Sequence, residues 1–185
     1  MDYPDLSNKS VAVVGNASSI LKHNSGAEID SHDFVIRFNR AMNLTEYNPE
    51  WDIHVGTKTD MWCVWHFEED LKNIPKEPEY IMWMAFWDEN GRDDVLKYPE
   101  TLIANLIKKT GLRLPTSGLM LLEWLDQQNT GPVSVYGFDW FVSPSSHEGT
   151  EWNDELKKKV DNAGHNFNYE REWCLAMYNK FYFKG

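Results

Sequence analysis

The chain has 185 residues, of which 42% are hydrophobic, so we expect one domain over residues 1–185 with a substantial core. A formal net charge of −11 argues against a nucleic-acid partner, because binding to phosphate backbones is driven by basic surface. No apolar run approaches the roughly 20 residues that cross a bilayer, and residues 1–10 resemble neither a signal peptide nor an anchor, so no transmembrane segment is expected.

Short apolar runs in the first half of the chain predict strands. The first is β-branched and ends at Gly15, which is typical of a buried strand that enters a tight turn. The strands expected in this half are residues 11–14, 34–38, 59–65 and 80–86. The polar stretch 43–57 indicates irregular structure.

The second half of the chain combines helical spacing with one further strand. We expect helices at 100–109, with Gly111 as a stop, and at 119–125, which is apolar almost all round. A strand at 133–136 ends in Gly137, and residues 141–150 suggest a mobile loop over a site. Charged or amphipathic helices are expected at 151–160 and 169–181, the latter with Trp173, Met177 and Phe181 on one face.

Strands that alternate with helices predict an α/β fold with a mostly parallel sheet. The two cysteines, Cys63 and Cys174, lie in aromatic surroundings, so we expect buried free thiols and a cytoplasmic, reducing location. Cys63 and His66 have the spacing of two metal ligands, but no second pair follows them, so zinc is not expected.

Sites in parallel sheets lie at the carboxyl ends of the strands, and polar residues follow the first two strands here. Backbone amides and the side chains of Asn16, Ser18 and Ser19 suit a phosphate or ribose, although this stretch alone fits an ordinary connection better. Asn39 offers both a donor and an acceptor, which suits a ribose or base edge, or else a turn.

Residues 115–118 come directly before the apolar helix. Free amides and the helix dipole make such a start an anion site, with Thr116, Ser117 and Gly118 as the expected contacts. The same residues also fit an ordinary N-cap by Thr116 or Ser117, and both roles can hold together.

A histidine stands at the entry to the last helix. An imidazole titrates near neutrality, so His165 can take a proton from a sugar hydroxyl, although a lone histidine is more often structural. Glu170 is expected either to orient this ring or to cap the helix. His147 lies in the expected mobile loop, and Trp140 and Phe141 are candidates to wall an acceptor.

No strict Asp-x-Asp pair occurs in the chain, whereas many enzymes acting on nucleotide sugars use that pair to hold a divalent metal. The Glu-x-Asp pairs of Glu28 with Asp30 and of Glu68 with Asp70 are interpreted as solvated surface. A transferase without metal or cofactor is therefore the simpler hypothesis. A CMP-sugar donor suits it, because its leaving group carries one phosphate.

Together these segments resemble the eukaryotic-type sialyltransferases, glycosyltransferase family 29. Residues 11–22, 28–39 and 55–60 look like the large sialylmotif of that family. Residues 114–118 through 133–138 look like the small motif, and 165–170 is similar to the very small one, a His and a Glu with four residues between them. The motifs occur in family order.

The resemblance implies a single Rossmann-like domain of the GT-A variant type, with helices on both faces of the sheet, and an inverting, metal-independent transfer. It places Asn16 and Asn39 at CMP, Thr116 to Gly118 at its ribose and phosphate, and His165 as the base. The complete expected site comprises the catalytic residues His165 and His147 and the substrate-binding residues Asn16, Ser18, Ser19, Asn39, Thr116, Ser117, Gly118, Gly137, Phe138 and Glu170.

The chain departs from the family pattern at the two motif cysteines, which are absent, and this favours a bacterial or viral protein from a reducing interior. The third motif is not clearly present, and His147 is the candidate for its phosphate-side histidine. The expected partners are a CMP-sugar donor and a glycan or glycolipid acceptor, with the oligomeric state open. The rival hypotheses are transfer of another CMP-activated acid such as Kdo, a non-catalytic CMP- or sugar-binding module, and an unrelated nucleotide-binding α/β domain.

Overall fold

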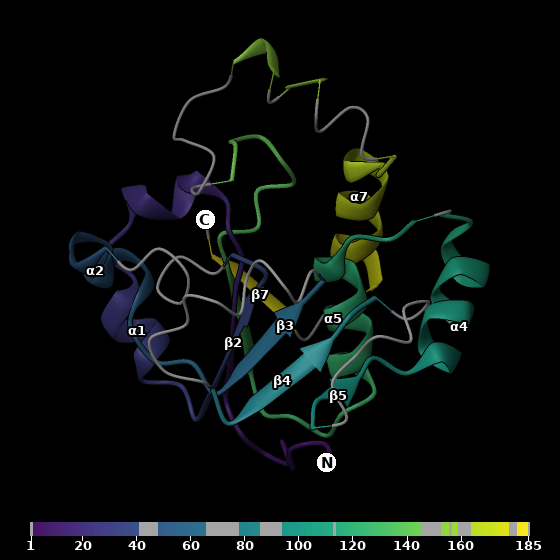
Figure 1. Ribbon diagram of the computed structural model, residues 1–185, viewed down its shortest axis with the longest axis horizontal. Helices are drawn as coiled ribbons and strands as arrows, with labels where there is room; N and C mark the ends of the chain where they lie inside the picture. Colours follow the sequence, from purple (N-terminus) through teal and green to yellow (C-terminus); the bar gives the residue numbers. More distant parts are fainter. Residues whose placement is uncertain are drawn as a thin grey trace.

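Within the part of the chain that the structure describes, seven parallel strands form one sheet in the order β5-β4-β3-β2-β1-β6-β7 (Figure 1). This computed structural model describes residues 2–40, 48–65, 78–85, 94–112, 114–145, 153–155, 157–158, 164–177 and 181–184. The strands are β1 (Val11–Val14), β2 (Phe34–Phe38), β3 (Met61–Val64), β4 (Tyr80–Trp83), β5 (Leu96–Lys97), β6 (Val133–Tyr136) and β7 (Phe181–Lys184). The expected parallel α/β sheet is confirmed.

Strands β1, β2, β3 and β6 are buried along their whole length, which explains why their sequences are apolar except for Arg37 and Ser134. From β1 the chain builds the sheet outward in one direction to β5, and then returns to place β6 on the other side of β1. The crevice at such a reversal, outside the carboxyl ends of the strands, is where open α/β sheets bind ligands.

Helices cover both faces of the sheet, as the family resemblance implied (Figure 1). One face packs on α4 (Glu100–Thr110), α5 (Ser117–Asp126) and α7 (Phe167–Met177). The other packs on η1 (Ser18–Lys22), α1 (Gly26–Asp30), η2 (Pro49–Trp51) and α2 (Asp52–Val55). Alternate residues of β1 serve the two faces, because Val11 and Val13 belong to the first core and Ala12 and Val14 to the second.

Both expected helices in the middle of the chain are present. Helix α4 ends where Gly111 takes a left-handed conformation, with φ of 68°, as its stop signal predicted. In α5 every residue of 119–125 is buried, which explains why that stretch is apolar almost all round.

The structure corrects two expected elements. The segment 43–57 is not irregular throughout, because residues 49–55 form η2 and α2. The last helix ends at Met177, and Phe181 begins strand β7, where it pairs with Val133. The helical spacing of Phe181 with Trp173 predicted the wrong element for Phe181. This residue pairs with β6 at the edge of the sheet, and that pairing places it in a strand. Of the expected helix 151–160, residues 153–155 and 157–158 are described. Residues 154–155 and 157–158 are helical, and the Lys157 amide donates to the Asn153 carbonyl at 3.1 Å.

Cys63 and Cys174 are both free and buried, as predicted. Burial raises the pKa of both thiols. The cytoplasmic location stays a prediction. Among the helices described here, none has the length and apolar character needed to cross a membrane.

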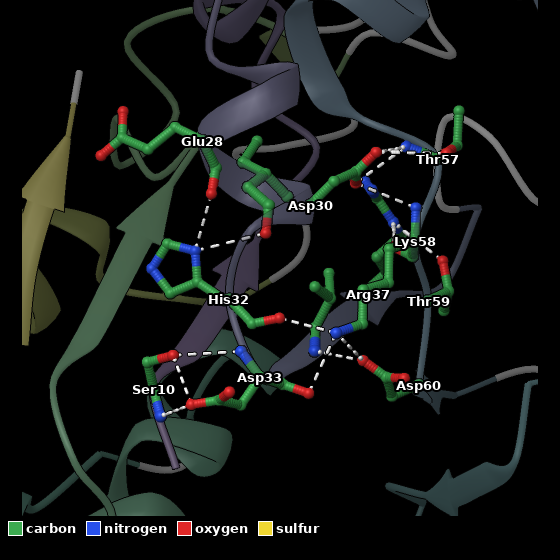
Figure 2. Close-up of polar contacts among 12 residues, drawn as sticks. Ser10, Glu28, Asp30, His32, Asp33, Arg37, Thr57, Lys58, Thr59 and Asp60 are labelled. Atoms are coloured by element: carbon green, nitrogen blue, oxygen red, sulfur yellow. Dashed lines mark hydrogen bonds and ion pairs between the residues drawn. The ribbon is translucent and has the colours of Figure 1, made fainter.

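A buried arginine organises the segment that leads from α2 into β3. Arg37 on β2 is 1% exposed and donates from Nη2 to the Val55 carbonyl at 2.7 Å and from Nε to the Lys58 carbonyl at 3.1 Å. Its Nε also lies 2.9 Å from Thr59 Oγ1. Figure 2 shows that Asp30 receives the backbone amides of Thr57 and Lys58 in the same network. Asp30 is therefore a structural anchor rather than solvated surface, and the network holds β2, which ends beside the site.

Candidate active site

A cavity of about 540 Å³ lies at the sheet reversal, at the carboxyl ends of β1, β2 and β6. Its walls also include Trp65 after β3 and the residues before and at the N-termini of α5 and α7, so six segments distant in sequence converge here. The lining residues are Gly15, Asn16, Ala17, Phe38, Asn39, Arg40, Trp65, Leu114, Pro115, Thr116, Ser117, Gly118, Gly137, Phe138, Asp139, Trp140, Phe141, Ser143, Ser145, His165, Phe167 and Glu170.

The two expected asparagines both line this cavity, and each is held through one end of its amide. Asn39 follows β2 with φ of 41°, and its Oδ1 accepts from the Trp65 amide at 3.1 Å. Asn16 Nδ2 donates to the Phe38 carbonyl at 3.1 Å. Among the described contacts this leaves the side-chain Nδ2 of Asn39 as a donor and the side-chain Oδ1 of Asn16 as an acceptor. Such a donor and acceptor suit a nucleoside.

The Phe138 ring packs against Gly15 and Gly118, where the Cβ of any other residue would clash with it. A Cβ on Gly118 would lie 2.6 Å from Phe138 Cε1, and one on Gly15 would lie 2.7 Å from Phe138 Cδ2. The ring also meets Phe38 edge-on, with centroids 5.8 Å apart. Gly118 therefore sets how closely α5 approaches the strand ends.

The N-terminus of α5 faces the cavity and has the expected cap. Thr116 is the N-cap, and its Oγ1 accepts from the Leu119 amide at 3.2 Å. The next two amides, those of Ser117 and Gly118, belong to the first helical turn and have no intrahelical partner. Both residues line the cavity, so this end can receive an anion.

Glu170 has a role that the sequence did not predict. It is fully buried on α7, and its Oε1 accepts from the Thr116 amide at 3.0 Å while its Oε2 accepts from Thr116 Oγ1 at 2.5 Å. The carboxylate thus caps α5 from another helix, instead of orienting His165 or capping α7. Burial raises the pKa of Glu170 to about 7, although the two bonds from Thr116 act in the opposite direction.

His165 lies at the rim of the cavity with a defined ring orientation. Its Nδ1 lies 2.8 Å from the Leu114 carbonyl oxygen. Because a carbonyl oxygen only accepts, Nδ1 carries the hydrogen and Nε2 keeps its lone pair. The site therefore presents an imidazole nitrogen that can accept a proton.

Hydrogen bonds hold the loop after β6 against the turn after β1. Asp139 Oδ2 accepts from the Ser143 amide at 2.9 Å and from Ser143 Oγ at 2.5 Å. The Ser18 amide donates to the Pro144 carbonyl at 2.9 Å, and the Ser19 amide donates to Ser143 Oγ at 3.0 Å. Neither Ser18 nor Ser19 is among the cavity-lining residues, so the structure places them as loop supports rather than as expected contacts.

His147 lies outside the described residues. Gly137 and Phe138 line the cavity, with the expected asparagines, helix start and His165. Sequence reasoning missed Arg40, Trp65 and Phe167, which line it as well. The one available signal was position, because Arg40 and Trp65 come within two residues of the ends of β2 and β3 and Phe167 lies within the 165–170 motif. In the described part of the chain no group of three or more His, Cys, Asp or Glu could hold a metal ion.

Comparisons with known proteins match the first part of the chain to one family. Residues 3–79 match the family model of glycosyltransferase family 29 (sialyltransferase). A Gallus gallus protein, CMP-N-acetylneuraminate-beta-galactosamide-alpha-2,3-sialyltransferase 1, is 35% identical over 71 residues, which are 38% of this chain and 19% of the Gallus protein. The chain thus spans under a fifth of the length of this curated relative.

Solved structures share the fold over nearly the whole chain. A crystal structure of a mammalian sialyltransferase matches with a TM-score of 0.64 and 21% identity, covering 96% of this chain and 69% of that one. A mammalian sialyltransferase in complex with Gal-beta-1-3GalNAc-ortho-nitrophenol matches with a TM-score of 0.64 and 19% identity, with the same coverage. The α/β architecture is therefore that of these solved enzymes.

Proposed function

We propose that this chain, whose residues 3–79 match the model of glycosyltransferase family 29, is a sialyltransferase that transfers sialic acid from CMP-sialic acid to a sugar hydroxyl. One observation carries the proposal. A single cavity of about 540 Å³ joins nucleoside-binding amides, a free helix N-terminus and an imidazole with an open Nε2. These are the groups that an anionic sugar nucleotide and a nucleophilic hydroxyl require.

The donor binds on the side of the cavity formed by β1, β2 and α5. Asn16 Oδ1 and the side-chain Nδ2 of Asn39 contact the nucleoside. The backbone amides of Ser117 and Gly118 donate to the negatively charged phosphate. Local donors of this kind are needed, because the protein carries a formal net charge of −11. The dipole of α5 adds to the attraction, since its positive end faces the phosphate.

The transfer is one displacement with inversion at the anomeric carbon. Nε2 of His165 takes the proton of the acceptor hydroxyl as its oxygen forms a bond to that carbon. The bond between the anomeric carbon and the phosphate oxygen of CMP breaks, and its electron pair leaves with CMP. General-base assistance of this type contributes about 10²–10⁴-fold to the rate.

We propose that the reaction needs no metal ion. The leaving group carries one phosphate, and the preorganised amides at the start of α5 stabilise the negative charge that develops on it. The Leu114 carbonyl keeps the His165 proton on Nδ1, so the base is in the required tautomer before the acceptor arrives.

The test is release of CMP from CMP-sialic acid with lactose as acceptor, with and without EDTA, by wild type and His165→Ala. We expect EDTA to leave turnover unchanged and the variant to lose at least about 100-fold in kcat while CMP still binds. His23→Ala is the matched control, because His23 is exposed and outside the cavity. Turnover with CMP-Kdo but not with CMP-sialic acid would show that the donor is a different CMP-activated acid. CMP binding without turnover would indicate a binding module instead of an enzyme.

A further inference from the structure

Both oxygens of a buried carboxylate bind the residue that caps the proposed phosphate site. Glu170 on α7 is fully buried, and its oxygens accept from the backbone amide and from Oγ1 of Thr116. Thr116 is the N-cap of α5, and the next two residues, Ser117 and Gly118, line the cavity, as Glu170 itself does. The carboxylate therefore lies at the same helix end as the proposed phosphate.

A carboxylate and a phosphate at one helix N-terminus share the same positive charge. That end carries about half an elementary charge, which comes from its free backbone amides. An ionised Glu170 already uses the Thr116 amide, so a phosphate on the amides of Ser117 and Gly118 adds a second negative charge beside it. Burial leaves little water to screen the repulsion between the two anions. Protonation of Glu170 removes this repulsion and keeps both contacts, because the acid O–H can donate to Thr116 Oγ1.

This carboxyl group changes its charge near neutral pH. Burial raises the pKa of Glu170 to about 7, and the two bonds from Thr116 act in the opposite direction. Burial also raises the pKa of the Cys174 thiol on the same helix, as does the Glu170 charge, so Cys174 stays neutral. The other titratable or charged groups that share the cavity with Glu170 are Arg40, Asp139 and His165.

The donor and the product of the proposed reaction differ in charge at the phosphate. The phosphate of CMP-sialic acid is a diester with one negative charge. CMP is a monoester, and its second proton leaves at a pKa of about 6. At neutral pH the product therefore places nearly two negative charges where the donor places one, and an ionised carboxylate at the same helix end repels the product more strongly.

We propose that Glu170 distinguishes CMP from its sugar ester: the ionised carboxylate weakens binding of the doubly charged phosphate, and CMP binds with uptake of a proton by Glu170. This inference rests on the proposed function, which places the phosphate at the start of α5. Glu170 contacts Thr116 and not the reacting atoms, so it is a positioning residue whose charge acts at the N-cap. After transfer, the added charge on CMP favours its release while Glu170 is ionised.

The first experiment measures by calorimetry the affinity for CMP and for cytidine 5′-(methyl phosphate), at about pH 6 and about pH 8. The methyl ester keeps one negative charge throughout, and neither ligand requires turnover. At the higher pH we expect Glu170→Gln to bind CMP roughly 10-fold more tightly than wild type, and the methyl ester at most about threefold more tightly. At the lower pH the two proteins are expected to agree within about twofold, because Glu170 is then mostly protonated.

Proton uptake gives a second measurement that uses the wild-type protein. Heats of CMP binding at about pH 7.5, in two buffers with different ionisation enthalpies, give the number of protons bound. We expect wild type to take up roughly half a proton more than Glu170→Gln. Glu172→Gln, at an exposed position on the same helix, is the matched control and is expected to take up as many protons as wild type. Equal uptake by wild type and Glu170→Gln, or an equal gain in affinity for CMP and the methyl ester, would overturn the inference.

The same measurements separate this inference from the proposed function. Proton-linked CMP binding that depends on Glu170, in a protein that transfers no sialic acid, would retain the role of Glu170 and remove the proposed function. CMP binding that is independent of Glu170, in a protein that does transfer sialic acid, would remove the role of Glu170 alone. Absence of CMP binding by wild type would remove both.

Discussion

The Glu170 carboxylate binds Thr116 twice, through the backbone amide at 3.0 Å and through Oγ1 at 2.5 Å. These residues are 54 positions apart and belong to the first turn of α7 and the N-cap of α5. The same two segments meet again where His165 Nδ1 donates to the Leu114 carbonyl at 2.8 Å. The proposed phosphate end and the proposed base are therefore held as one unit.

Thr116→Ala removes the cap of α5 and one of the two bonds to Glu170. We expect it to lower the free energy of unfolding by about 1–2 kcal/mol, the usual cost of losing a threonine cap, and to raise the KM for the donor. Urea denaturation and donor kinetics measure the two effects. Thr101→Ala on the exposed side of α4 is the control, and equal losses from both variants would contradict the role of Thr116.

Glu170→Gln tests the buried carboxylate through pH. Burial raises the folded-state pKa from 4.5 to about 7, so the folded state holds the proton more tightly than the unfolded state does. The stability from this proton is complete below about pH 4.5 and is lost as pH rises through 7. Glutamine copies the protonated acid, since its oxygen accepts from the Thr116 amide and its NH₂ donates to Thr116 Oγ1.

As pH rises from 4.5 to 7.5, the wild type is expected to lose about 3 kcal/mol of unfolding free energy that Glu170→Gln keeps. The difference in stability between the variant and the wild type therefore shifts in favour of the variant over this range. Unfolding in urea across that range is the measurement. Glu172→Gln, at an exposed position on the same helix, is expected to keep the wild-type trend. A constant difference between Glu170→Gln and wild type at every pH would show that Glu170 does not titrate there.

Gly118→Ala tests the packing of α5 against Phe138. In a helix alanine is favoured over glycine by about 0.5–1 kcal/mol, so any loss has to come from the clash at 2.6 Å. We expect CMP affinity to fall about 10-fold or more, measured by calorimetry, because the ring moves into the nucleotide wall. Phe138→Leu removes the clashing atoms, so the double variant is expected to bind CMP no worse than Phe138→Leu alone. Additive losses would refute the clash.

Arg37→Lys tests the anchor beneath the site. Burial lowers the pKa of Arg37 to about 10, so the guanidinium stays charged at neutral pH. A lysine ammonium cannot reach the Val55 and Lys58 carbonyls and Thr59 Oγ1 together, and we expect a loss of about 2–4 kcal/mol in unfolding free energy. Arg171→Lys on the exposed face of α7 is the control, expected to change stability by less than about 0.5 kcal/mol.

Strands β1, β2 and β6 in the middle of the sheet could be predicted to the residue, β3 was predicted about two residues too long at its start and one at its end, and the edge strands β5 and β7 were not predicted. Residues 11–14, 34–38 and 133–136 are buried on both faces, mostly apolar, and bounded by polar residues or glycine, so the sequence shows where burial begins and ends. Strands β5 and β7 were missed, because they are short or alternate between buried and exposed side chains. Phe181 kept helical spacing with Trp173, and its contact with Val133 overrode that local preference.

The sequence by itself determined the class of fold, the segments of the site and the residue types in each, since local patterns and motifs lie within a few neighbouring positions. The tertiary structure alone decided that Glu170 caps Thr116, that Leu114 sets the His165 tautomer and that Phe141 stacks on Phe167. Each of these contacts joins segments 26 to 54 residues apart. Their geometry depends on how the helices pack on the sheet, which no local pattern in the chain records.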